Sequence, residues 1–140
     1  MTALPDDGDF RDIDGLVRRF EAASLDAAAF HHRQHLIVAA SLLDASPYDV
    51  ALARMRKGLC GLLAKVGKDA YHETVTVFWM RALHYRLAQC DAALSLRDRI
   101  REVVMWAETA QPLRAHYSQK LLASVDARKE FVEPDLLPLP

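Results

Sequence analysis

Histidine is the residue type in this sequence with the widest chemical use. The six histidines are His31, His32, His35, His72, His84 and His116. Neutral imidazole binds transition metals, and its ordinary pKa of about 6.5 also suits it to proton transfer near neutral pH. Several histidines that share one end of a fold therefore indicate a metal site, an acid–base site or a polar binding pocket.

Two of these histidines belong to one expected helix. Apolar residues recur at helical spacing from residue 31 or 32 to Ala45. His32 falls on that apolar stripe and His35 on its flank. Both side chains are therefore expected at the N-terminal end of a buried helix face, whereas His31 and His84 lie off the apolar stripes of their helices and are expected at the surface.

His72 has the same position on another expected helix, which begins between residues 69 and 73 and ends near residue 89. Short connections favour antiparallel neighbours, so these two helices share a direction, and the chain after the next helix returns His116 to the same end. Four histidines can thus converge at one end of the bundle, and one interpretation is that they hold a divalent transition metal such as zinc, iron or nickel. They are His32, His35, His72 and His116.

Two other interpretations stand beside the metal site. The histidines can be structural, capping helices or hydrogen-bonding Glu73, Tyr117 and backbone carbonyls, and this interpretation leads. They can also line a metal-free pocket for a small molecule or for acid–base work. In the enzyme hypothesis Glu73 and Tyr117 are the catalytic or orienting groups. The competing class is a non-catalytic interaction protein whose apolar tail docks on a partner or on a second copy in a homodimer.

The composition around these residues favours helices. Hydrophobic residues make up 51% of the 140, and 22 Ala and 20 Leu stand against 10 Val and 3 Ile. Ala and Leu are strong helix formers, while β-branched residues favour strands. The length suits one domain. We expect a single all-α domain, a bundle of about five main helices with short C-terminal helices, a flexible N-terminus over residues 1–11 and an extended proline-rich tail over residues 134–140.

Three further main helices are expected, and one of them contains two glycines. The three cover residues 12–23, 47–66 and 96–109, with shorter pieces near 117–123 and 125–131. Gly58 and Gly61 each cost the second of these helices about 1 kcal/mol relative to Ala. They predict the close approach of a neighbouring helix. Gly67 stands where a left-handed C-terminal cap is expected.

Several function classes are disfavoured by charge and motif content. The formal net charge of −1 argues against a nucleic-acid binder. No secretory signal or membrane-spanning stretch is found, so a cytoplasmic location without membrane contact is expected. Cys60 and Cys90 form no CxxC pair, which disfavours redox and zinc-ribbon sites. Gly-rich phosphate loops and GxSxG motifs do not occur.

Three segments carry a family resemblance. They are FHHRQHL at 30–36 with Ala39, YHETVT at 71–76 followed by Trp79, and a closing run with YSQKLLAS at 117–124, AR at 127–128 and FVEPDLLPLP at 131–140. Together they resemble a family of small, largely uncharacterised bacterial all-α proteins. The bundle is also similar to histidine-ligated four-helix metalloproteins of the DinB type, with a different histidine spacing.

The family resemblance implies that these motifs act as one unit, and it brings no assigned activity. It singles out nine residues, namely His32, His35, Tyr71, His72, Glu73, Tyr117, Ser118, Arg128 and Asp135. Through it, Tyr71, Ser118, Arg128 and Asp135 are expected to line a binding pocket beside the histidines.

Overall fold

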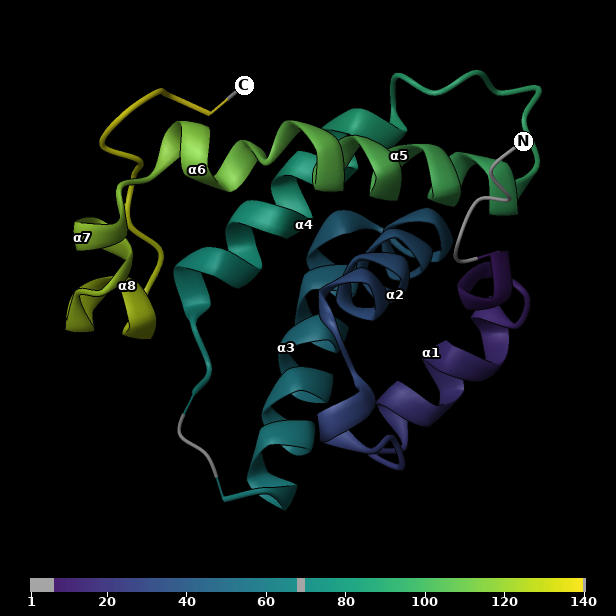
Figure 1. Ribbon diagram of the computed structural model, residues 1–140, viewed down its shortest axis with the longest axis horizontal. Helices are drawn as coiled ribbons and strands as arrows, with labels where there is room; N and C mark the ends of the chain where they lie inside the picture. Colours follow the sequence, from purple (N-terminus) through teal and green to yellow (C-terminus); the bar gives the residue numbers. More distant parts are fainter. Residues whose placement is uncertain (1–6, 68–69, 140) are drawn as a thin grey trace.

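Helix α2 (His32–Ala45) is the centre of the fold and packs against α1, α3, α4 and α5. The computed structural model describes residues 7–67 and 70–139 (Figure 1). Within these ranges no strand occurs, so the predicted all-α class is confirmed. In chain order the other elements are the 3₁₀-helix η1 (Asp7–Phe10), α1 (Ile13–Glu21), the 3₁₀-helix η2 (Ala27–Ala29), α3 (Tyr48–Lys65), α4 (Glu73–Leu87), α5 (Leu96–Ala110), α6 (Pro112–His116), α7 (Gln119–Leu122) and α8 (Val125–Lys129).

Burial of α2 extends beyond the single stripe expected from its sequence. All residues from 36 to 40 are buried, together with Leu42 and Leu43. A helix with neighbours on several sides is apolar around most of its circumference. The polar residues of α2 gather instead in its first turn, where His32 and His35 lie next to the core rather than inside it.

The glycines of α3 differ in what they permit. A Cβ atom at Gly58 would lie 2.1 Å from Cε2 of Phe20 on α1, so the predicted close approach is confirmed there. At Gly61 the nearest atom would be Cβ of Ala23 at 3.8 Å, which is ordinary contact. Gly67 has φ of +67°, the left-handed conformation expected of a helix C-cap.

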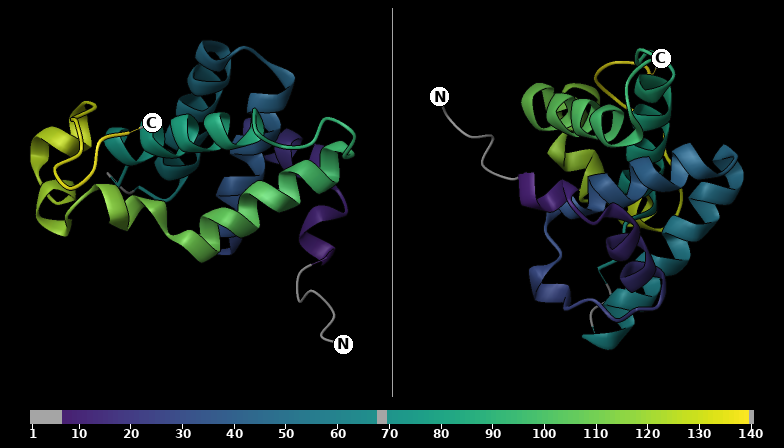
Figure 2. Two further views of the ribbon diagram at one scale, coloured as in Figure 1. Left: turned by 90° about the horizontal axis from the view of Figure 1, so that it is seen from above. Right: turned by 90° about the vertical axis from the view of Figure 1, so that its right-hand side faces the viewer.

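The junction between α5 and α6 holds a left-handed residue that is not glycine. Gln111 has φ 46° and ψ 55°, and Pro112 follows at the first position of α6. The sequence pattern did not predict α6. Figure 2 shows that this short helix continues along the same side of the molecule as α5 after a bend. It thereby reaches α4, with which it is in contact.

The C-terminal segment, residues 117–139, folds back onto the N-terminal part of α4 (Figure 1). Fully buried Thr74 on α4 links the two: its Oγ1 donates to Glu130 O at 2.9 Å and accepts from Val132 N at 3.2 Å. The tail then returns to α6, where Leu136 N donates to His116 O at 3.0 Å. The tail is thus part of the folded domain.

Part of the N-terminal segment expected to be flexible packs on the core. Phe10 of η1 is buried in the core, and the guanidinium of Arg101 lies over its ring at 5.3 Å from the centroid. One aromatic side chain within residues 7–11 is therefore part of the core. Residues 1–6 of that expectation lie outside the described ranges.

The cysteines and the character of the helices bear on the expected chemistry and location. Cys60 is exposed and Cys90 half-buried, and both are free thiols. Within residues 7–67 and 70–139, no helix combines the length and the apolar character that crossing a membrane requires.

Candidate functional site

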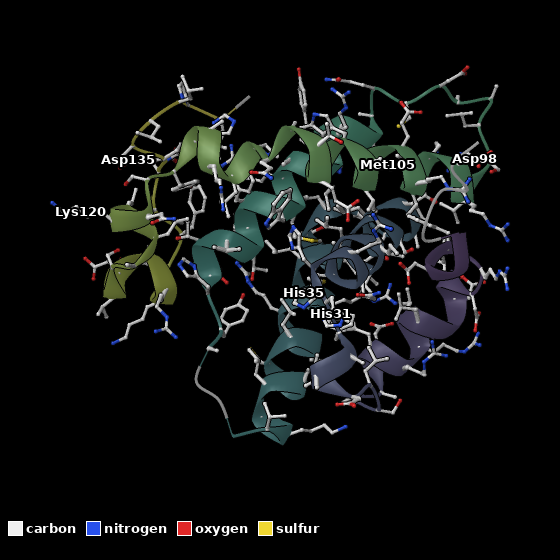
Figure 3. All side chains as sticks on the ribbon, in the orientation of Figure 1. His31, His35, Asp98, Met105, Lys120 and Asp135 are labelled. Atoms are coloured by element: carbon white, nitrogen blue, oxygen red, sulfur yellow. The ribbon has the colours of Figure 1, made fainter. Side chains whose placement is uncertain are left out.

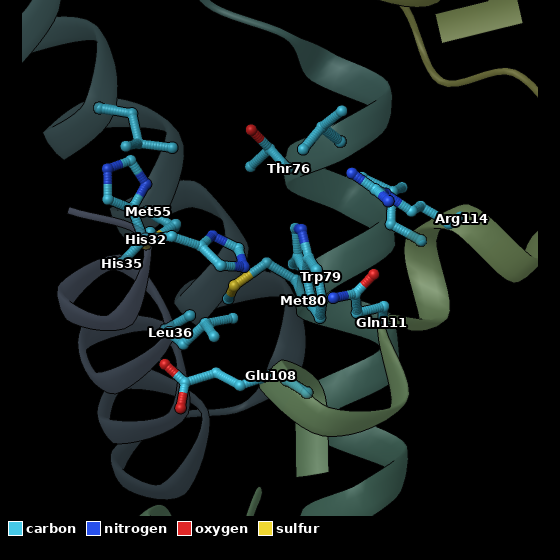
Figure 4. Close-up of a pocket in the computed structure, with 15 residues that line it drawn as sticks. His32, His35, Leu36, Met55, Thr76, Trp79, Met80, Glu108, Gln111 and Arg114 are labelled. Atoms are coloured by element: carbon cyan, nitrogen blue, oxygen red, sulfur yellow. The ribbon is translucent and has the colours of Figure 1, made fainter. Parts of the chain in front are cut away.

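A pocket of about 630 Å³ opens between α2, α3, α4, α5 and α6 (Figure 4). Its apolar wall includes Leu36, Ala39, Met55, Leu59 and Met80. Its polar side chains are His32, His35, Thr76, Glu108, Gln111 and Arg114. A concave, largely apolar space with a few convergent polar groups is the usual form of a small-molecule site.

Two of the predicted histidines line this pocket. The ring of His32 meets the ring of Trp79 edge-on, with centroids 5.2 Å apart. The ring of His35 stacks on Phe30 at 4.3 Å. These aromatic contacts fix the orientation of both imidazoles at the start of α2.

The pKa values of both imidazoles lie below the ordinary histidine value. Burial, aided by the neighbouring charge of His32, lowers the pKa of His35 to about 4. Burial also lowers the pKa of His32, while the carboxylate of Glu108 opposes that shift. A neutral imidazole has one donor and one acceptor nitrogen. The pocket therefore offers neutral hydrogen-bonding groups along its α2 side.

The carboxylate in the pocket is already paired. Arg33 on α2 donates from Nε to Glu108 Oε2 at 2.8 Å and from Nη2 to Oε1 at 2.6 Å. Such a bidentate pair is stronger than a single hydrogen bond between neutral groups. Glu108 is thus held by α2 and is not free to serve as a general base.

His72 lies at the N-terminus of α4, with both ring nitrogens engaged. Its Nδ1 accepts from Val75 N at 3.2 Å, which caps the helix. Its Nε2 donates to Leu122 O of the C-terminal segment at 2.7 Å. A metal ion could bind this imidazole only by replacing one of these bonds, so His72 is a structural residue here.

His116 also holds the C-terminal segment. Its Nδ1 donates to Leu137 O at 2.9 Å, and its ring packs on Phe78 with centroids 5.7 Å apart. His116 therefore lies against the tail and does not line the pocket.

The four histidines predicted as metal ligands are divided by the structure into two pairs. His32 and His35 line the pocket, while His72 and His116 bind backbone carbonyls of the C-terminal segment. Over the described ranges no three His, Cys, Asp or Glu side chains are grouped so that they could hold a metal ion. The expected convergence fails because each of the second pair has a carbonyl partner nearer at hand.

The two residues predicted as catalytic do not line the pocket. Glu73 accepts a hydrogen bond from Tyr71 Oη at 2.5 Å and pairs with Arg56 of α3. Burial and the hydrogen bond to Glu73 raise the pKa of Tyr71 to about 12. Tyr71 and Glu73 thus form a link between α3 and α4.

Tyr117 is buried, and its Oη donates to Val132 O at 2.6 Å. Burial, with the nearby charge of Glu133, raises its pKa to about 12. An acid this weak, with its proton committed to a carbonyl, is poorly suited to acid–base catalysis at neutral pH. Its position makes it a tie between α6 and the tail.

The remaining predicted pocket residues belong to the same C-terminal segment. Ser118 Oγ donates to Asp135 Oδ2 at 2.5 Å, and Ser118 N donates to Asp135 Oδ1 at 2.9 Å. These bonds hold the pKa of the exposed Asp135 below its usual value. Arg128 is exposed on α8. Figure 3 shows His35 in the interior and Asp135 at the outer edge of the molecule, so this group is separate from the pocket.

Three polar residues of the pocket were not singled out from the sequence. Glu108 follows Ala107, which lies on the apolar stripe of the expected helix over residues 96–109, and that neighbour was the available signal. Gln111 and Arg114 had no signal, because α6 itself was not predicted. The missing helix therefore also explains the missing pocket residues.

Comparison with models of protein families, with curated proteins and with solved structures gives no match for this chain. The argument for function therefore depends on the geometry of the pocket.

Proposed function

We propose that the protein binds a small organic molecule in the pocket between α2 and α6. The observation that carries this proposal is an open, largely apolar space of about 630 Å³ that the imidazoles of His32 and His35 line. A space of this size is typical of sites for drug-sized molecules. A binding role needs no catalytic acid or base, and the carboxylate that lines the pocket, Glu108, is paired with Arg33.

The apolar wall supplies the affinity in this proposal. Burying apolar surface contributes roughly 25 cal/mol per Å², so a ligand lying on Leu36, Met55 and Met80 is stabilised mainly by contact area. The ring of Trp79 adds a flat surface for stacking. The neutral imidazoles of His32 and His35 then select for orientation through single hydrogen bonds.

The proposal is tested with phenylnaphthylamine, a neutral fluorescent molecule that brightens in apolar sites. Val75 lines the pocket and is half-buried, and its backbone N–H keeps its bond to His72 whatever side chain it carries. Val75→Phe fills the space and is expected to weaken binding at least tenfold. Val50→Phe, at a valine 43% exposed on α3 outside the pocket, is the matched control and should bind as the wild type does.

Two outcomes would overturn the proposal. One is an affinity for phenylnaphthylamine that Val75→Phe leaves unchanged, since the molecule would then bind elsewhere. The other is no saturable binding by the wild type. A circular dichroism spectrum shared by the two variants shows that the comparison is between folded proteins.

A second candidate function is docking on a partner or on a second copy through the tail. It is favoured by Leu136 and Leu137, which are 54% and 52% exposed although the backbone around them is bound to α6. The test is the oligomeric state of Leu136→Ser/Leu137→Ser. An assembly of the wild type that this variant loses supports docking, and an unchanged mass in solution contradicts it.

We also propose a cytoplasmic location. Its support is the exposed free thiol of Cys60, which a reducing compartment preserves. A fusion of the full chain with a fluorescent protein tests it, and enrichment outside the cytoplasm would contradict it.

A further inference from the structure

The cationic side chain in the pocket, Arg114, has no carboxylate partner among the described residues. The other arginine beside the pocket, Arg33, is neutralised by Glu108 at 2.6 Å. His32 and His35 contribute no charge near neutral pH. The polar lining therefore carries one uncompensated positive charge, that of Arg114.

The helix that carries Arg114, α6, begins after a residue with an uncommon backbone conformation. Gln111, immediately before α6, adopts φ 46° and ψ 55°. For a residue other than glycine this left-handed conformation is uncommon and is disfavoured by roughly 1 kcal/mol or more. Non-glycine residues in such conformations cluster at functional sites, where the surrounding structure holds them. Gln111 also lines the pocket itself.

The tail supplies the structure that holds α6 in place. Leu136 N donates to His116 O at 3.0 Å, and His116 Nδ1 donates to Leu137 O at 2.9 Å. Tyr117 Oη donates to Val132 O at 2.6 Å directly after the helix. A helix of five residues is not stable alone. The C-terminal segment is therefore the support that keeps Arg114 and Gln111 at the pocket.

The arrangement of the polar groups around the pocket is asymmetric. Figure 4 shows Arg114 and Gln111 on the α6 side, and the two histidines come from α2 on the opposite side. Trp79 and Met80 lie between these sides on α4. A ligand that satisfies both sides has a charged end and an apolar body.

We infer that the pocket recognises an organic anion, with a carboxylate or similar oxyanion bound by Arg114 and an apolar body against Trp79 and Met80. The guanidinium presents paired N–H donors that match the two oxygens of a carboxylate, and such charge-assisted bonds are the stronger ones in proteins. Gln111 lines the same side of the pocket as Arg114. This inference depends on the proposed binding function and narrows its ligand class.

The test compares two probes that share one ring system. Anilinonaphthalenesulfonate is an anion, and phenylnaphthylamine lacks the sulfonate. The wild type is expected to bind the anion more tightly than the neutral probe. Arg114→Gln should weaken binding of the anion about tenfold and leave the neutral probe unchanged, because the variant loses the charge-assisted hydrogen bonds to the sulfonate.

Arg97→Gln is the matched control, since Arg97 is an exposed arginine on α5 outside the pocket. It should change neither affinity. Raising the salt concentration should weaken binding of the anion only, because exposed charges are screened.

The outcomes separate this inference from the proposed function. If Val75→Phe abolishes binding of both probes while Arg114→Gln leaves their affinity ratio unchanged, the pocket binds ligands and the anion inference is wrong. If Arg114→Gln weakens both probes equally, Arg114 acts on the structure of the pocket and the inference is again wrong. If neither probe responds to Val75→Phe, the proposed function fails and the inference fails with it.

Discussion

Two pairs of histidines, one in the first turn of α2 and one against the C-terminal segment, differ in what their rings contact. One ring nitrogen of His72 and one of His116 donate to backbone carbonyls of the C-terminal segment, at 2.7 and 2.9 Å. His32 and His35 make ring contacts with Trp79 and Phe30 and line an open pocket. One pair therefore holds the C-terminal segment, and the other lines the pocket.

This difference follows from what lies beside each pair. The second pair faces a returning chain, whose backbone carbonyls need donors, because buried carbonyls without partners are costly. The first pair faces a space lined mainly by side chains. Residue type alone cannot separate these roles, and the variants below do so by removing one contact at a time.

The largest effect is expected for His72→Ala. The change removes the cap of α4 at Val75 N, worth about 1 kcal/mol, and leaves Leu122 O without its donor at a further cost of about 1–2 kcal/mol. The free energy of unfolding in urea should therefore fall by about 3 kcal/mol. The matched His32→Ala removes an exposed side chain and should cost less than about 0.5 kcal/mol. Equal losses of unfolding free energy in the two variants would contradict the different roles of the two histidine pairs.

Thr74→Val is expected to cost about 2 kcal/mol. The buried hydroxyl satisfies Glu130 O and Val132 N, and valine of similar shape leaves both without a partner. Thr76→Val is the control, because its Oγ1 donates to the N-cap carbonyl His72 O, which already accepts from Thr76 N, so the change leaves that carbonyl with a partner. Urea unfolding of both variants gives the comparison, and a loss at Thr76 as large as that at Thr74 would contradict it.

His35 is expected to make stability depend on pH. Its pKa is about 4 in the folded protein, below its ordinary value of about 6.5, so between these values the unfolded chain binds more protons. The stability difference between wild type and His35→Gln should shift against the wild type as pH falls from about 6.5 to 4 and level off below. We expect on the order of 1.5 kcal/mol, about half of the roughly 3.4 kcal/mol that the two pKa values would give in full, because solvent screens the partly exposed ring. Parallel curves for the two proteins across that window would show that the imidazole is not buried as described.

The smallest of these effects is expected for Tyr117→Phe. One hydrogen bond to Val132 O is lost, which costs about 1 kcal/mol. Because the tail keeps its other bonds to His116 and Thr74, the affinity for phenylnaphthylamine should not change. Thermal unfolding and a fluorescence titration check the two parts, and a lost affinity at full stability would instead assign Tyr117 to the binding site.

The parts of the fold that repeat with helical period could be predicted from the sequence. Helices α1 to α5 follow apolar stripes of this kind. The close approach of Phe20 on α1 to Gly58 could be predicted as well, because glycine inside a helix costs stability and so indicates a close neighbour. Helix α6 could not be predicted, because it depends on a left-handed Gln111 and on a tail that returns from beyond residue 130.

Only half of the candidate site could be predicted, because helical periodicity locates residues on α2 but not on α6. The stripe of α2 placed His32 and His35 beside the core, and the structure has them in one pocket. The partners of His72 and His116 are backbone carbonyls distant in sequence, which no spacing rule reveals. Arg114 lies on α6, which was not predicted, so the proposed ligand class could not be predicted from the periodicity of the sequence either.

The most direct test of the division into two pairs is an NMR titration of the imidazole Cε1–H signals with phenylnaphthylamine. The signals of His32 and His35 should move and saturate together with the fluorescence, while those of His72 and His116 stay in place. Shifts at His72 and His116, or no shift at His32 and His35, would contradict the account.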